Sequence, residues 1–144
     1  MEKYSVKDLH EKQVFNLDSI TLSEEEIINY AKLNDPLAFH IDKKAAEESM
    51  FKGFVSSGPH IFSAFHIKYW VPMFGETVIC GLELNNWKFL RPIYANQPTH
   101  CVITIIHLHR NPARGHAVIT WKYEFYTDKK EMVQTVEVTV MHKL

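Results

Sequence analysis

Residues 57–70, SGPHIFSAFHIKYW, constrain the fold more than any other part of the sequence. A glycine and a proline suited to a first helical turn are followed by a segment that is apolar on nearly every side of a helix. A helix of this kind has to be buried, so other elements must surround it. We therefore predict a central helix that is enclosed by the rest of the chain.

Four runs after this segment have the pattern of strands, at about residues 77–89, 99–110, 115–127 and 131–142. Apolar residues alternate with polar ones in AVITWKYEF and again at Val136, Val138 and Val140. In the first run the alternation slips at Asn85-Asn86, which predicts a β-bulge. The short connections RNPARG and TDKKE predict an antiparallel meander. The pattern indicates an α+β fold in which an antiparallel sheet wraps one buried helix, the hot-dog arrangement.

Length and charge set limits on the partners of this chain. Its 144 residues suffice for a single domain over 1–144 with a substantial core, and are too few for two domains. A formal net charge of -1 gives no general attraction to nucleic acid or to an anionic membrane. Cys80 and Cys101 lack the spacing of structural zinc ligands, and no apolar signal segment or membrane span is visible. We expect a cytoplasmic protein without nucleic-acid or membrane partners.

The segment before the central helix combines a capped helix with a polar loop. QVFNLDSITL alternates as a strand does, and in TLSEEEIINYAKL Ser23 caps a helix whose Glu26 completes a capping box. Pro36 disfavours helical geometry at Asp35, so the helix should end there and NDPLAFHID should begin as a loop. DKKAAEESMFKG then fits a short helix or turn that Asp42 caps.

Together these segments resemble the MaoC-like acyl dehydratases, also called (R)-specific enoyl-CoA hydratases. The family signature is an Asp, a His five residues later, a polar residue two further on, an alanine-rich turn, and then a small residue followed by Gly at the start of the central helix. Here the signature reads Asp35, His40 and Asp42, then Ala45-Ala46, then FKGFVSSG, which ends at Gly58. WKFLRPIYANQP also resembles the family's aromatic, Arg-Pro-Val and Gly-Asp segment, so the likeness runs from about Val14 to the last strand. The chain departs from many hydratases at Leu37-Ala38, Ser57, Pro59 and Ala95-Asn96-Gln97, positions that bear on substrate preference and rate.

The resemblance implies hydration of a trans-2-enoyl thioester to the (R)-3-hydroxyacyl thioester, and the reverse dehydration. This reaction needs an acceptor for a proton of water, an acid for the α-carbon, and a donor for the enolate-like oxygen. Asp35 and His40 would share the water, and the Gly58 N–H at the start of the buried helix would hold the oxygen. Pro59 leaves that donor in place. No metal or redox cofactor is implied, and coenzyme A or pantetheine is the carrier of the substrate, as in fatty acid metabolism.

Further residues are candidates for substrate binding. Ser57 would order the catalytic loop or the water, and Phe62 and His66 would line the acyl tunnel. Lys88 and Arg91 would meet the phosphates of coenzyme A. Each has a structural alternative: core packing for Phe62, a core hydrogen bond for His66 (and for His60), and solvated strand positions for the two cations.

Two histidine arrangements also have structural alternatives. Asp35 and His40 taken alone fit a turn residue and a packing histidine, and the Gly58 segment with the aligned strands is what favours catalysis. His107 and His109 lie two residues apart on one strand face and are candidate ligands of a metal ion. The spacing of the sequence places no third ligand near them, so side chains on a strand surface are the alternative.

Two other functions compete with the hydratase. A hot-dog acyl-CoA thioesterase would direct water at the thioester carbonyl, and a catalytically weakened acyl-thioester binding or scaffold subunit would bind without turnover. The position of Asp35 and His40 before the central helix favours the hydratase. In all three cases the outer strand edges of so small a sheet need a partner, so we expect a homodimer.

Overall fold

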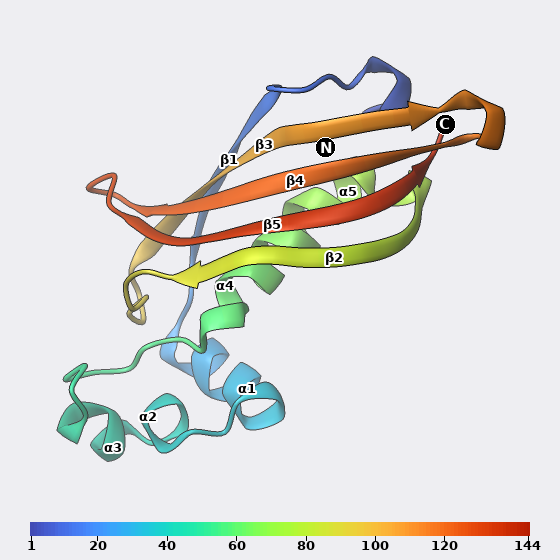
Figure 1. Ribbon diagram of the computed structural model, residues 1–144. Coiled ribbons are helices and arrows are strands. Elements are labelled where there is room, and N and C mark those ends of the chain that lie inside the picture. Colours follow the sequence, from blue (N-terminus) through green and yellow to red (C-terminus); the bar gives the residue numbers. More distant parts are fainter.

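One antiparallel sheet of five strands dominates the computed structural model, which describes residues 1–144 (Figure 1). The strands are β1 (Val14–Thr21), β2 (Val78–Phe89), β3 (Pro98–Asn111), β4 (His116–Thr127) and β5 (Met132–Lys143). Their order in the sheet is β1-β3-β4-β5-β2, so β3, β4 and β5 form the predicted meander and β1 and β2 are the edges. All four strands predicted after the helix are confirmed to within one residue at each end.

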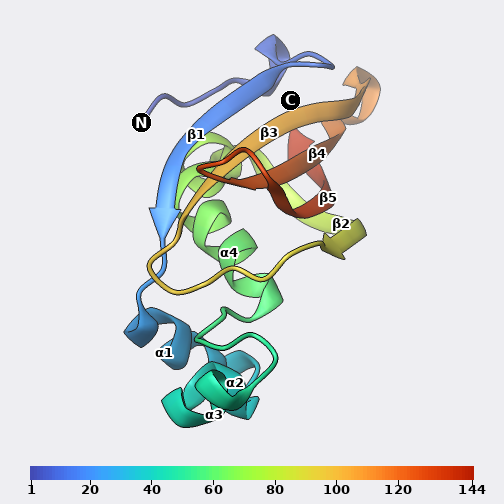
Figure 2. The same cartoon turned by 90° about the vertical axis from the view of Figure 1, so that its left-hand side faces the viewer.

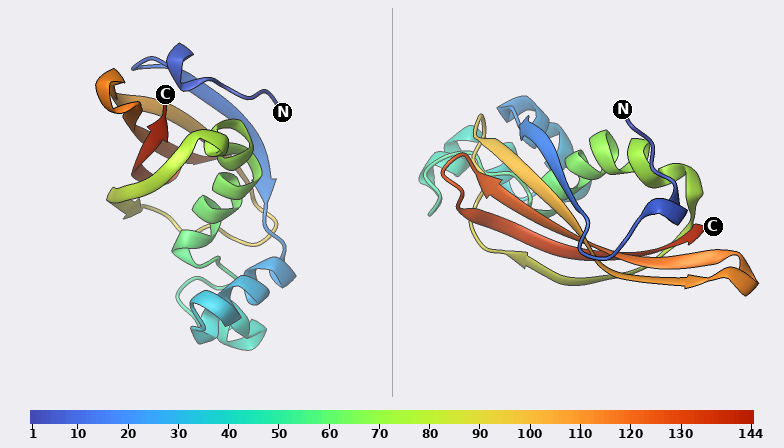
Figure 3. Two further views of the ribbon diagram at one scale, coloured as in Figure 1. Left: turned by 90° about the vertical axis from the view of Figure 1, so that its right-hand side faces the viewer. Right: turned by 90° about the horizontal axis from the view of Figure 1, so that it is seen from above.

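The central helix runs along the concave face of the sheet, which curves around it (Figure 3). It begins as α4 (Gly58–Phe65), continues through a π-helical turn at His66–Trp70 and ends as α5 (Val71–Phe74). Three shorter helices, α1 (Glu24–Asn34), α2 (Ala38–Ile41) and α3 (Lys43–Glu48), gather beside the N-terminal end of α4 (Figure 2). Short 3-10 turns lie at Val6–Asp8, Gly75–Thr77 and Pro112–Arg114. This α+β hot-dog architecture confirms the predicted fold class.

Local capping fixes the segment that leads into the candidate site. Ser23 Oγ accepts from the Glu26 N–H at 3.1 Å and the Glu26 carboxylate accepts from the Ser23 N–H at 2.8 Å, which is the predicted capping box. Helix α1 ends before Asp35, whose φ of -161° and ψ of 72° are not helical. Asp42 Oδ1 accepts from the Ala45 N–H at 2.7 Å, so its capping role is also confirmed.

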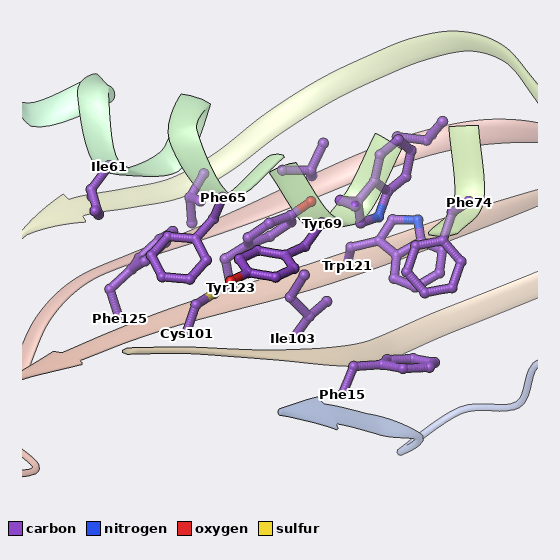
Figure 4. Close-up of a cluster of buried hydrophobic side chains, with 14 of the residues drawn as sticks. Phe15, Ile61, Phe65, Tyr69, Phe74, Cys101, Ile103, Trp121, Tyr123 and Phe125 are labelled. Carbon is purple, nitrogen blue, oxygen red and sulfur yellow. The ribbon is translucent and has the colours of Figure 1, made fainter. Parts of the chain in front are cut away.

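Alternation along β4 places one face of the sheet against the central helix. Ala117, Ile119, Trp121, Tyr123 and Phe125 are fully buried, and Figure 4 shows three of these rings beneath the helix. The ring of Phe125 lies 5.6 Å from that of Phe65 on α4. Each such side chain contributes on the order of 1.5–3 kcal/mol when it leaves water. The packing therefore holds the helix, and with it the Gly58 end, in a fixed place over the sheet.

The prediction that the central segment is buried on nearly every side is wrong for its outer face. Ile67 is 70% exposed and Val71 is 44% exposed. Phe65 and Trp70, which point towards the sheet, are buried. The sheet covers only one side of the helix in this chain, and an apolar pattern alone does not reveal which side stays open.

Edge strand β2 carries the predicted bulge and an exposed apolar surface. Its register against β5 shifts between Asn85 and Lys88, and Asn86 has a φ of 48°. The edge strand leaves Ile79, Leu82 and Leu84 between 47% and 49% exposed. None of the helices is both long enough and apolar enough to span a membrane.

Candidate active site

Asp35 and His40 face each other across the start of α2. His40 Nδ1 lies 2.6 Å from the carbonyl oxygen of Val55, and a carbonyl can only accept, so Nδ1 carries a proton. In the neutral ring the other nitrogen, Nε2, is then an acceptor. It lies 3.5 Å from Asp35 Oδ2, another acceptor. Two acceptors at this spacing are arranged to receive both hydrogens of one water molecule.

The two groups differ in their access to solvent. The side chain of His40 is 6% exposed, whereas that of Asp35 is 36% exposed. The bond to Val55 fixes the orientation of the imidazole ring, since rotation would leave a buried donor without a partner. His40 is therefore the rigid member of the pair, and Asp35 is held from another direction.

Ser57 supplies that restraint. Ser57 is 1% exposed, and its hydroxyl donates a hydrogen bond to Asp35 Oδ2 at 2.8 Å. Because Ser57 directly precedes α4 and Asp35 directly follows α1, this bond joins the loop after α1 to the central helix. The expectation that Ser57 orders the catalytic loop agrees with this contact.

Gly58 occupies the first position of α4, where a backbone N–H has no acceptor within its own helix. The helix dipole adds partial positive charge at that end, and Pro59, the next residue, leaves the Gly58 donor intact. A Cβ on Gly58 would lie 2.6 Å from Cε1 of Phe89. The close approach that requires glycine here is therefore made by the Phe89 ring.

A cavity of about 480 Å³ opens beside these groups. Asp35, His40 and Gly58 all line it, as does Arg91. The other contributors are mostly apolar and come from α2, the start of α4 and the loop before it, the end of β2 and the chain after it, and β5; they are Phe39, Phe51, Val55, Ser56, Pro59, Phe89, Leu90, Pro92, Ile93 and Gln134. The structure thus brings together the three predicted catalytic residues at one apolar cavity.

Four predicted substrate-binding residues do not line this cavity; one of them, Ser57, lies behind it and bonds to Asp35 instead. Phe62 packs against Trp87 and Tyr123, with ring centroids 5.4 Å and 5.2 Å away. His66 Nδ1 bonds to the Tyr123 hydroxyl at 3.1 Å, so the structural alternative holds for both helix residues. Lys88 is exposed and lies outside the cavity lining. Phe62 and His66 thus contact other aromatic side chains, and a tunnel lined by them stays a prediction that this cavity does not include.

Arg91 does reach the cavity, although its side chain is 59% exposed. Its guanidinium lies 3.5 Å from the carboxylate of Glu131. Because the Arg91 side chain is largely exposed, a charged part of a ligand that bonds it can stay in contact with water.

Two other histidines, His60 and His142, are buried. Burial lowers the pKa of His60 to about 4, against an opposing effect of Glu26, and burial also lowers the pKa of His142 to about 4. The His60 ring stacks on the Tyr30 ring with centroids 4.1 Å apart; His60 lines a separate cavity beside Glu26 and Lys68 and not the one that holds Asp35 and His40. No group of three or more His, Cys, Asp or Glu side chains is arranged to hold a metal ion.

Sequence reasoning missed several residues that line the cavity. Phe39 and Phe51 pack on each other 5.4 Å apart, and Phe39 also lies against the His40 ring at 4.4 Å. Gln134 on β5 reaches the cavity from the sheet. The one signal in the sequence was that Gln134 interrupts the apolar alternation that Val136 and Val138 continue.

The sequence matches the model of the MaoC-like domain over residues 6–124, which is most of the chain. The chain belongs to the MaoC-like dehydratase family. It is 28% identical over 134 residues to the uncharacterised protein YdeM of Bacillus subtilis, covering 91% of this chain and 93% of that protein.

Solved structures of MaoC-like proteins share the fold. A MaoC-like dehydratase from Rhodospirillum rubrum superposes with a TM-score of 0.81 at 23% identity, covering 95% of this chain and 94% of that chain. The (R)-hydratase from A. caviae involved in PHA biosynthesis superposes with a TM-score of 0.75 at 19% identity, covering 93% and 97%. The chain therefore shares its family with the MaoC-like dehydratases and its fold with these solved structures.

Proposed function

We propose that this MaoC-like protein hydrates trans-2-enoyl thioesters of coenzyme A or of an acyl carrier to (R)-3-hydroxyacyl thioesters, and catalyses the reverse dehydration. The observation that carries the proposal is the pair of acceptors, His40 Nε2 and Asp35 Oδ2, set 3.5 Å apart at a cavity that Gly58 also lines. The A. caviae structure, an (R)-hydratase, has the same fold and supports the reaction class.

The geometry suits addition of water across a conjugated double bond. A water held by the pair donates one hydrogen to His40 Nε2 and the other to Asp35, which leaves its oxygen lone pair free to attack C3 of the enoyl group. Electron density moves towards the thioester oxygen, where the Gly58 N–H and the start of α4 stabilise the developing charge.

The proton balance closes within the same pair. The proton that the water gives to the pair returns to C2 as the enolate collapses to the thioester, so the net change is addition of H and OH. Because a single pair both takes and returns the proton, both groups add to the same face of the double bond. Ser57 contributes by holding the Asp35 oxygen that bonds the water.

Arg91 is the residue that we assign to the carrier. It lines the cavity and is largely exposed, so its guanidinium can bind a phosphate of coenzyme A while staying hydrated. Lys88 is exposed on the same strand-to-loop segment and would add a second positive charge near the phosphates.

We further propose that the protein works as a homodimer. The exposed apolar residues of edge strand β2, Ile79, Leu82 and Leu84, form a surface that an identical strand would cover. Measurement of the molar mass in solution tests this part independently of activity.

Substitution of the pair tests the proposed chemistry. Asp35→Asn and His40→Ala should each reduce hydration of crotonyl-CoA by at least about 100-fold, the size expected for loss of a general base. Circular dichroism and molar mass should stay as in the unmodified protein. Near-normal turnover in either variant would contradict the assignment.

A further inference from the structure

Gln134 is a polar residue at an inward-facing position of β5. Val136, Val138 and Val140 continue the same face of the strand and are buried against the core. Gln134 itself is 2% exposed, and its side-chain nitrogen Nε2 is buried without a hydrogen-bond partner. An unpaired buried amide is costly, on the order of 1–3 kcal/mol, so an apolar side chain would be more stable in this place.

The position of Gln134 relates it to the proposed reaction centre. It lies directly opposite Phe89 in the β2–β5 ladder, and the Phe89 ring packs against Gly58. Directly opposite side chains in a ladder share one face and have Cβ atoms about 5 Å apart. Gln134 also lines the cavity that holds Asp35 and His40. Gln134 thus lies in the cavity wall, opposite the strand residue whose ring packs on the glycine that would bind the thioester oxygen.

Aromatic side chains limit the length of an acyl chain that fits beside Gln134. Phe62, Trp87 and Phe89 form a continuous row, with ring centroids 5.4 Å apart for the first pair and 5.6 Å for the second. Phe89 lines the cavity, whereas Phe62 and Trp87 lie behind it. A cavity wall backed by packed rings favours short acyl chains over long ones.

We propose that Gln134 selects short 2-enoyl thioesters that carry a hydroxyl group just beyond the double bond. The proposal rests on the proposed function and names the substrate class of that site. A hydroxyl both donates and accepts, so it bonds whichever end of the amide turns towards it. No group of the protein bonds the amide nitrogen, and a molecule in the cavity that Gln134 lines would supply a partner for the amide.

A carboxylate is a poorer match for this position. Gln134 is neutral, and the cation that lines the cavity, Arg91, is largely exposed and already lies beside Glu131. A carboxylate buried against the amide would lack a charged partner, which is strongly unfavourable. A site built to bond a hydroxyl also discriminates against the analogue without it, because the buried amide is then left unpaired.

Two substrates of equal chain length test the proposal. The probes are 4-hydroxybut-2-enoyl-CoA and crotonyl-CoA, which differ by one hydroxyl, and the readout is the ratio of their kcat/KM values. We expect the unmodified protein to prefer the hydroxylated substrate by about tenfold or more, the size of one discriminating hydrogen bond. Gln134→Met, similar in size but unable to bond, should bring the ratio to one or below while crotonyl-CoA is still hydrated.

Control variants separate this role from a structural one. Thr135→Val changes the neighbouring, outward-facing residue and should leave the ratio unchanged. The Tm of Gln134→Met should be equal to or above that of the unmodified protein, since an unpaired amide is removed, and Gln134→Leu serves as a second apolar variant. If Gln134→Met lowers kcat/KM equally for both substrates, the amide bonds a group that both substrates share, such as the thioester carbonyl, and the proposal is overturned. An unchanged ratio would overturn it as well, whereas no hydration of either substrate by the unmodified protein would count against the proposed function itself.

Discussion

Replacement of Ser57 by alanine removes one hydroxyl and tests how the structure holds its proposed base. The Ser57 hydroxyl donates to Asp35 Oδ2 at 2.8 Å and has almost no contact with solvent. Without it, Asp35 keeps its backbone position but loses the bond that sets the direction of its carboxylate. Asp35 should then turn towards solvent, to which its side chain is already 36% exposed.

The magnitude follows from the strength of a hydrogen bond to a charged group, about 1.5–3 kcal/mol. Partial exposure of Asp35 places this bond at the lower end, about 1.5 kcal/mol, because water replaces part of it. A change of 1.36 kcal/mol in the activation free energy corresponds to tenfold in rate. We therefore expect kcat for crotonyl-CoA hydration to fall about tenfold in Ser57→Ala, with KM changed by less than a factor of about two.

The assay follows the loss of enoyl absorbance at several concentrations of crotonyl-CoA, so that kcat and KM are separated. Ser56→Ala is the matched control, because Ser56 is the adjacent buried serine and lines the cavity without a side-chain hydrogen bond to Asp35. It should keep kcat within about twofold of the unmodified protein. The reasoning is refuted if Ser57→Ala retains full kcat, or if Ser56→Ala loses as much as Ser57→Ala.

Three further predictions concern stability and assembly. Gly58→Ala should lower the unfolding free energy in urea by about 1–3 kcal/mol, because the added Cβ would overlap the Phe89 ring. Combining it with Phe89→Ala should recover most of this loss. If Gly58→Ala destabilises the chain equally with and without the Phe89 ring, the contact is contradicted. Burial lowers the pKa of His60 and His142 to about 4, so the unfolded chain binds more protons below pH 6.5 and stability should fall from about pH 6.5 to pH 4. In His142→Asn the unfolding free energy should depend less steeply on pH over that window, and an unchanged slope would refute the role of this histidine. Leu84→Glu on β2 should halve the molar mass measured by light scattering if β2 forms the proposed dimer interface, whereas an intact dimer would place the interface elsewhere.

Much of the fold follows from short-range patterns in the sequence. Period-two alternation between Ala117 and Phe125 fixed which face of β4 is buried, and Ser23 with Glu26 marked the start of α1. Such features depend on neighbours in the chain and need no knowledge of the tertiary arrangement. The bulge at Asn86 was likewise visible as a slip in the alternation.

The candidate site was predictable where a motif spans it and less so elsewhere. Asp35, His40 and Gly58 meet at one cavity as the family resemblance implied. The bond from Ser57 to Asp35 crosses 22 positions of the chain, and only the folded structure shows which oxygen it reaches. The role of a side chain on the central helix depends on the rotation of that helix, which an all-round apolar pattern leaves undefined. For this reason Phe62, assigned to the acyl tunnel, packs outside the cavity, and Gln134, which no motif marks, lines it.

One measurement tests the central claim most directly. Purified protein and its His40→Ala variant are mixed with crotonyl-CoA, and the enoyl absorbance and free thiol are recorded together. We predict rapid loss of absorbance without thiol release in the unmodified protein, and a loss at least about 100-fold slower in the variant. Thiol release would indicate a thioesterase, and binding of crotonyl-CoA with neither signal would indicate a binding subunit; either result would contradict the assignment of Asp35 and His40 to water addition.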